Sequence, residues 1–129
     1  MRVRKAVQAV VKNGKMFLVV RKPDLRSGRL AWRLVKGGVE KGEAPERAML
    51  RELKEETGLK GRVGKKLHSY KYPFAGLRHD VTVFLVIAKG KPRFLDGELC
   101  GSRWVSADKA LRLLKWKDEK TAIRNALNA

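Results

Sequence analysis

Three glutamates, Glu52, Glu55 and Glu56, lie within five consecutive residues, with the second and third following the first by three and four positions. On a helix this spacing places all three carboxylates on one face. The chain has 13 Asp+Glu against 31 Lys+Arg, yet five of its acids lie between residues 43 and 56. Like charges this close repel one another, so we expect a cation among them. Because carboxylate oxygens are hard ligands that suit Mg²⁺ or Mn²⁺, the sequence predicts a divalent-metal site.

The glutamates belong to a longer pattern, residues 37–59, which read GGVEKGEAPERAMLRELKEETGL. This segment resembles the Nudix box, G-x5-E-x7-R-E-U-x-E-E-x-G-U with U aliphatic, at every specified position. The resemblance implies an α/β protein, the Nudix α/β/α sandwich with a central mixed β-sheet, as a single domain over residues 1–129. It also implies hydrolysis of a nucleoside diphosphate linked to another group, with Mg²⁺ or Mn²⁺ as the cofactor.

The same resemblance implies roles for the box residues. Glu52, Glu55 and Glu56 are expected to be metal ligands, and the carbonyl of Gly37 is expected as a further ligand. Arg51 is expected to pair with an acid, either Glu43 or a helix glutamate, and thereby to fix the carboxylate rotamers.

Hydrolysis also needs a group that accepts the proton of the attacking water. Glu55 is one candidate for this base. Glu98, in the segment DGELCGSRW, is the other, because an acid at such a place serves as a ligand or base in related enzymes. An exposed loop acid without a catalytic role is an equally good interpretation of Glu98.

Residues outside the box indicate the substrate. The segment 32–37, WRLVKG, resembles the W-x-x-P-K-G entry of diadenosine tetraphosphate hydrolases, with Val35 in place of the proline. Lys36 is expected to bind phosphate as a point charge. Tyr70 and Tyr72 lie where that subfamily places aromatic side chains that stack on a base, although Tyr72 is equally well interpreted as a core or turn residue. Residues 107–118 resemble that subfamily's C-terminal segment. The favoured reaction is therefore diadenosine tetraphosphate to ATP and AMP.

Three other interpretations stay open. Pro73 lies about where ADP-ribose pyrophosphatases have a proline after the box. The net charge of +18 suits either removal of pyrophosphate from RNA 5′ ends or a basic nucleotide- or RNA-binding module without activity. The same charge is equally consistent with a surface bias toward Lys and Arg that has no binding role.

Composition limits the class of protein and its location. With 129 residues, 43% apolar and 34% charged, the chain is expected to be one globular domain. No window approaches the ~18 apolar residues that a membrane helix needs. Cys100 is the single cysteine, which fits a reducing cytoplasm. The expected partners are nucleotide polyphosphates and RNA, without a membrane, and the sequence leaves monomer and homodimer open.

The metal face must lie on a helix, and the surrounding pattern predicts where that helix begins and ends. Pro45 suits the first helical turn, and Gly58 suits a left-handed C-terminal cap after Thr57. Residues 36–42 are predicted to form a glycine-rich loop, and residues 72–76 a turn. Asn13 and Gly14 favour a hairpin. Strands are predicted at 3–12, 16–21, 30–35, 62–70, 80–89 and 101–105, and further helices are predicted up to residue 114 and over 118–127.

Overall fold

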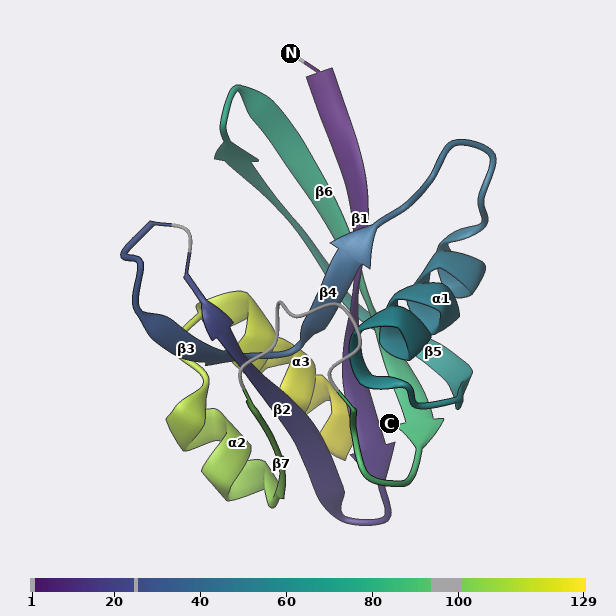
Figure 1. Ribbon diagram of the computed structural model, residues 1–129, viewed down its shortest axis with the longest axis vertical. Coiled ribbons are helices and arrows are strands. Elements are labelled where there is room, and N and C mark those ends of the chain that lie inside the picture. The colour runs from purple at the N-terminus through teal and green to yellow at the C-terminus, as the bar shows by residue number, and fades with distance from the viewer. Residues whose placement is uncertain (1, 25, 94–100) are drawn as a thin grey trace.

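A computed structural model describes residues 2–24, 26–93 and 101–129 of the chain (Figure 1). The strands are β1 (Arg2–Asn13), β2 (Met16–Pro23), β3 (Leu30–Arg33), β4 (Val35–Gly38), β5 (Gly61–Phe74), β6 (Leu77–Ala88) and β7 (Gly101–Val105). The helices are α1 (Pro45–Thr57), α2 (Ala107–Leu113) and α3 (Lys117–Leu127). No helix in these three ranges is long and apolar enough to cross a membrane.

The strands form one mixed sheet that divides at β1. The main order is β3-β2-β1-β6-β5, with β1 and β6 parallel and the other pairs antiparallel. β1 pairs with β2 only at its end, through Lys12 and Asn13. Nearer its start, over residues 6–9, β1 pairs instead with β4, because β2 has turned away toward β3 and β7. The division leaves β4 beside the centre of the sheet, close to α1.

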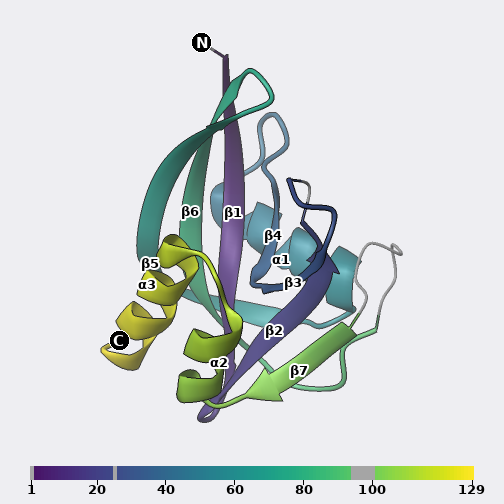
Figure 2. The same cartoon turned by 90° about the vertical axis from the view of Figure 1, so that its left-hand side faces the viewer.

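Helices cover both faces of this sheet, which confirms the predicted α/β/α sandwich. Helix α1 packs on one face, and α2 and α3 pack on the other (Figures 1 and 2). Alternate residues of β1 point to opposite faces, as the two-residue period of a strand requires. Val7, Ala9 and Val11 therefore join the core under α1, whereas Ala6 and Val10 join the core under α2 and α3.

Helix α1 begins and ends where local signals predicted. Pro45 occupies its first turn, and Gly58 closes it with a left-handed backbone, φ 75°. Met49, Leu53 and Thr57 are buried, so the stripe that they form packs on the sheet and the neighbouring stripe is left for the glutamates. Both termini also carry favourable charges, because Glu46 lies in the first turn and Lys54 lies in the last.

Two segments between residues 30 and 38 differ from the sequence prediction, and β6 begins at Leu77 rather than at residue 80. Residues 30–35 were predicted as one strand but form β3 and the start of β4, which pair with different neighbours. The break falls at Leu34, whose N–H donates to a side chain of α3 instead of to a strand. Residues 36–38 were predicted as loop but extend β4, because β1 offers them a partner edge.

The turn after β5 is also shorter than predicted. β5 continues as a strand to Phe74, so Tyr72 lies within the sheet, paired with His79. The chain reverses at Ala75 and Gly76, which have φ values of 52° and 76°.

Candidate active site

The site begins where α1 crosses β4. Alternation along β4 points Gly37 toward α1, and the side chain of Glu52 lies directly against it. A Cβ atom placed on Gly37 would be 2.0 Å from Cδ of Glu52 and 2.1 Å from its Oε2, so only glycine allows this approach. Burial raises the pKa of Glu52, and the charge and hydrogen bond of Arg51 partly oppose that effect.

Arg51 holds the acids of this region together. Its Nε donates to Oε2 of Glu43 at 2.8 Å, and its Nη2 donates to Oε1 of the same carboxylate at 2.9 Å. Nη2 also donates to the carbonyl of Gly38 at 2.9 Å. Nη1 donates to Glu52 at 2.9 Å and to Glu55 at 3.1 Å. The expected pairing of Arg51 with Glu43 is thus present, and two helix glutamates share the same guanidinium.

This guanidinium controls the charge of Glu43. Its hydrogen bonds lower the pKa of Glu43 to about 2, with help from the backbone N–H of Glu40. Glu43 is therefore ionised at any pH near neutrality and works as a fixed anchor for Arg51.

The three box glutamates lie in different environments. Glu56 is 2% exposed, whereas the side chains of Glu52 and Glu55 are 16% and 55% exposed. Within the described ranges, no three acid, histidine or cysteine side chains already converge as a preformed metal cage. The donors themselves fit Mg²⁺ or Mn²⁺, since they are carboxylate oxygens, and the carboxylate of Glu52 lies against the bare backbone of Gly37.

The residues predicted to bind substrate lie on the opposite face of the sheet from α1, with Lys36 on β4 and Tyr70 and Tyr72 on β5. Nζ of Lys36 donates a hydrogen bond to the Tyr72 hydroxyl and lies 4.5 Å from the centre of the Tyr72 ring. Burial lowers the pKa of Lys36 to about 8, and the positive charges of Arg33 and Arg4 act in the same direction. The carboxylate of Glu119 acts in the opposite direction.

Aromatic rings continue from Lys36 along β5. Tyr72 stacks on His79 with ring centres 4.8 Å apart, and Tyr70 lies 6.1 Å from Tyr72 in a parallel orientation. The structure therefore brings together Lys36, Tyr70 and Tyr72. Their predicted roles in binding substrate stay predictions, as do the roles of the box residues. Glu98 lies outside the described residues.

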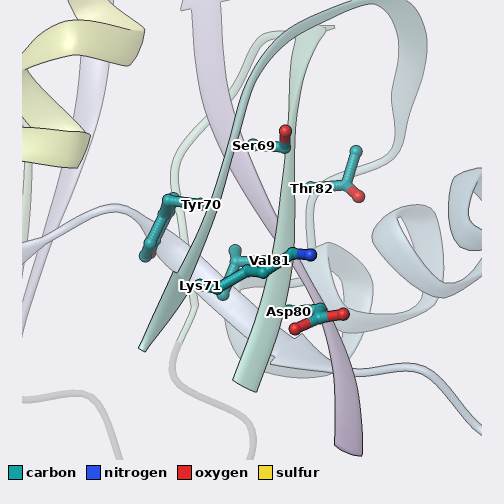
Figure 3. A pocket seen from close by; sticks show the side chains of 6 residues that line it. All are labelled: Ser69, Tyr70, Lys71, Asp80, Val81 and Thr82. Carbon is teal, nitrogen blue, oxygen red and sulfur yellow. The ribbon is translucent and has the colours of Figure 1, made fainter. Parts of the chain in front are cut away.

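A separate hollow of about 500 Å³ lies on the β5–β6 hairpin (Figure 3). Its lining residues are Ser69, Tyr70, Lys71, Asp80, Val81 and Thr82. Of the predicted site residues only Tyr70 belongs to it, so the hollow does not coincide with the glutamates of α1.

Sequence reasoning missed Glu119, the most connected acid on the α3 side. Its side chain is buried, at 1% exposure. It accepts hydrogen bonds from Gln8 Nε2 at 2.8 Å, Arg33 Nε at 2.9 Å and Leu34 N at 2.8 Å. Gln8 in turn accepts a hydrogen bond from the Tyr70 hydroxyl at 2.7 Å. Burial raises the pKa of Glu119. The network joins α3 to β1, to β5 and to the break between β3 and β4.

No local signal could have found this residue. The neighbouring sequence, KDEK at 117–120, has the composition of an exposed helix start. Only the packing of α3 on the sheet buries Glu119 and supplies its donors. Next to it, the guanidinium of Arg33 lies 3.9 Å from the centre of the Trp116 ring, which restricts the arginine from its other side.

Comparison with known proteins shows the family and the fold. The NUDIX domain family model matches residues 2–126. An RNA pyrophosphohydrolase from Actinobacillus succinogenes is 43% identical over 61 residues, which are 43% of this chain and 31% of that protein. The chain thus matches about a third of that relative's length.

Solved structures show the same fold. A MutT protein from Methanosarcina mazei Go1 superposes with a TM-score of 0.82 at 23% identity, covering 98% of this chain and 95% of the other. An Ap4A hydrolase from C. elegans superposes with a TM-score of 0.81 at 20% identity, covering 97% and 96%. Because the family model spans nearly the whole sequence, the chain belongs to the Nudix hydrolase family.

Proposed function

We propose that this Nudix hydrolase cleaves a phosphoanhydride bond in a nucleotide polyphosphate with the help of Mg²⁺ or Mn²⁺. The observation that carries the proposal is that the two faces of β4 meet different groups, a carboxylate on one face and a cationic and aromatic pair on the other. Gly37 faces the carboxylate of Glu52, and the next residue in each direction, Lys36 or Gly38, faces the opposite side. Lys36 points to Tyr72 on that opposite side. One short strand therefore connects an acidic face with a cationic and aromatic face.

Glu52, Glu55 and Glu56, with the Gly37 carbonyl, would hold the metal. When bound, the ion offsets the phosphate charge and lowers the pKa of a coordinated water. Arg51 holds the carboxylates of Glu52 and Glu55 in place.

The remaining residues bind substrate and move the proton. Lys36 attracts a phosphate, and Tyr72 or Tyr70 offers a ring for a base, which contributes about 1–3 kcal/mol per stacked base. As the water oxygen bonds to phosphorus and the bridging oxygen leaves, Glu55 or Glu98 accepts the water's proton. The exposure of the Glu55 side chain, 55%, leaves it open to solvent for this task.

The favoured substrate is diadenosine tetraphosphate, cleaved to ATP and AMP. It is supported by the resemblance of residues 32–37 and 107–118 and by the position of Tyr72 beside Lys36. Removal of pyrophosphate from RNA 5′ ends is the second candidate. It is supported by the net charge of +18 and by the similarity to an RNA pyrophosphohydrolase. Both substrates carry at least three consecutive phosphates.

One experiment tests the activity and separates the candidates. The protein is incubated with diadenosine tetraphosphate, triphosphorylated RNA or ADP-ribose plus Mg²⁺, and the products are identified by chromatography. ATP plus AMP supports the favoured substrate, and pyrophosphate released from RNA supports the second. Glu56→Gln should nearly abolish turnover, whereas Glu46→Gln, an exposed acid of the same helix, should not. If Glu56→Gln turned over substrate as fast as Glu46→Gln, with the circular dichroism spectra of both variants unchanged, the proposal would be refuted.

A further inference from the structure

Cations gather where the end of α1, the start of β5 and the end of β6 meet (Figure 1). Gly61 of β5 pairs with Ala88 of β6, and the N–H of Arg93 donates to the carbonyl of Thr57 at 2.7 Å. Residues 57–62 and 87–93 therefore run beside one another. The exposed cationic side chains of these two segments and of the last turn of α1, which we call the basic end, are Lys54, Lys60, Arg62, Lys89, Lys91 and Arg93.

The segments that form the basic end contain no acids. Neither residues 57–79 nor residues 81–93 include an Asp or a Glu. In the part of the chain that the structure describes, every ion pair is made by a cation outside the basic end, so no carboxylate neutralises any of the six. Like charges held this close raise the local potential and attract a polyanion.

An aromatic side chain borders the basic end. The indole N–H of Trp104 donates to the carbonyl of Gly90 at 2.9 Å, which fixes the half-buried ring beside the segment that carries Lys89 and Lys91. Cations together with an aromatic ring are the combination that binds single-stranded nucleic acid. A membrane surface would also require apolar side chains that insert, and among the described residues of these segments Ile87 is the one exposed large apolar side chain.

The basic end adjoins the proposed metal face. Glu56, one of the expected ligands, directly precedes Thr57, whose carbonyl binds the backbone of Arg93. A polymer whose 5′ end is held at the glutamates must continue over neighbouring surface, and the basic end begins within one turn of them on α1. A dinucleoside polyphosphate has no further backbone to be held there.

We propose that the basic end binds the phosphodiester backbone of a single-stranded RNA whose 5′ end lies at the glutamates of α1. The inference rests on the proposed function in its second form, removal of pyrophosphate from RNA 5′ ends, and adds the surface that holds the rest of the chain. The six cations contact phosphates without regard to sequence, and Trp104 offers its ring to a base. Binding of this kind is driven by counterion release, so it weakens steeply as salt is added.

The first test measures RNA binding separately from the active site. Fluorescence anisotropy in EDTA, at several salt concentrations, follows a labelled RNA of about 12 nucleotides, a length that a single small binding surface can span. The RNA has a 5′-hydroxyl group, so it offers the glutamates no triphosphate. The wild-type protein is compared with the triple variant Arg62→Ala/Lys89→Ala/Arg93→Ala, which removes half of the basic end.

The control variant is matched in charge. Arg112→Ala/Lys117→Ala/Arg124→Ala also removes two guanidinium groups and one ammonium group, from exposed positions on α2 and α3. The basic-end variant should weaken RNA binding roughly 10- to 100-fold at low salt. It should also reduce the slope of log K against log salt by about 2, because each lost phosphate contact of a single strand removes about 0.7. The control should change both quantities much less.

The second test uses the catalysed reaction. The basic-end variant should raise KM for triphosphorylated RNA and leave kcat within about twofold, because lost ground-state binding appears in KM. Its turnover of diadenosine tetraphosphate should match that of the wild type. If circular dichroism shows that the triple variant is unfolded, the single variants Arg62→Ala and Lys89→Ala decide the question, each with an expected loss of about 0.7 in the salt slope.

The outcomes separate this inference from the proposed function. Wild-type affinity in the basic-end variant, or equal losses in both triple variants, would overturn the RNA-binding surface. So would a wild-type protein that fails to bind the RNA, whether or not it sediments with phosphatidylserine vesicles. RNA binding without release of pyrophosphate from triphosphorylated RNA would refute the placement of the 5′ end. Absence of Mg²⁺-dependent hydrolysis on every substrate would overturn the proposed function, whereas anisotropy would still decide whether the basic end binds RNA.

Discussion

Arg51 and Glu43 form a two-bond ion pair between the loop before α1 and the middle of that helix. The donors Nε and Nη2 of the arginine meet Oε2 and Oε1 of the glutamate at 2.8 and 2.9 Å. Because both carboxylate oxygens are engaged, the plane of the guanidinium is fixed, and Nη1 is left directed at Glu52 and Glu55. The orientation of the acidic face therefore depends on an acid that is not itself one of the expected ligands.

Arg51→Lys should disrupt this arrangement while keeping its charge. An ammonium group cannot serve both oxygens of Glu43 and the Gly38 carbonyl with the same geometry. We expect the free energy of unfolding to fall by about 1.5–3 kcal/mol, measured by urea titration, and Mg²⁺-dependent turnover to fall as well. Arg47→Lys, on an exposed position of α1, is the control. A variant as active and as stable as wild type would contradict the proposed role of the pair.

The same pair predicts how stability changes with pH. Glu43 has a pKa of about 2 in the folded protein and an ordinary value of 4.5 when unfolded. A lowered carboxyl pKa contributes stability that is present above pH 4.5 and is lost as the pH falls from 4.5 toward 2. Thermal unfolding midpoints of wild type and Glu43→Gln, measured from pH 6 to pH 2.5, should therefore differ most at pH 6 and converge in acid. A gap that is constant with pH would show that ionisation of Glu43 has no part in stability.

Gly37→Ala should separate activity from folding. The new methyl group would overlap Cδ of Glu52, and the flexible glutamate side chain can rotate away with little cost to the fold. Displacing that carboxylate by an ångström or more should lower kcat on the order of 10²-fold. Gly101→Ala is the control, because the nearest atom to its Cβ, in Arg21, would be 3.7 Å away. Steady-state kinetics and thermal unfolding measure the two effects, and full activity in Gly37→Ala would refute the close-approach argument.

Glu119→Ala should be the most destabilising of these changes. It would leave the Arg33 guanidinium, the Gln8 amide and the Leu34 N–H without their acceptor in a buried position. Removing one partner of a buried ion pair costs about 3–5 kcal/mol, to be measured by urea unfolding. Asp108→Ala, in the first turn of α2, should cost less than about 1 kcal/mol. Similar losses in both variants would show that the network contributes little.

Local signals predicted the elements that depend on local sequence. The limits of α1 were predictable because Pro45 and Gly58 act within one turn of the helix ends, and the hairpin between β1 and β2 was predictable from Asn13 and Gly14. The break at Leu34 was not, because the side chain that accepts its N–H, Glu119, comes from the last helix. A hydrogen-bond partner so distant in the sequence does not change the pattern of apolar and polar residues near residue 34.

The candidate site divides in the same way. The box glutamates were identified from their spacing, which a helix converts directly into proximity, whereas the role of Arg51 was implied by the resemblance to the Nudix box. Lys36 and Tyr72 were each singled out, but their contact depends on β5 extending through residue 72 and on β4 pairing with β1.

The parallel pairing of β1 with β6 has a consequence for how the protein is made. β1 precedes the other strands of this sheet in the sequence, yet its partner along nearly its whole length, residues 77–87, is made much later. β5 and β6 can form a hairpin by themselves, whereas docking β1 requires closing a long loop, which is a slow and entropically costly step. During synthesis the apolar segment around Val7, Val10 and Val11 can pair early only with β2 and β4, and its β6 edge stays open until residues 77–87 have been made. That interval is when a chaperone would contribute most to the yield of folded enzyme.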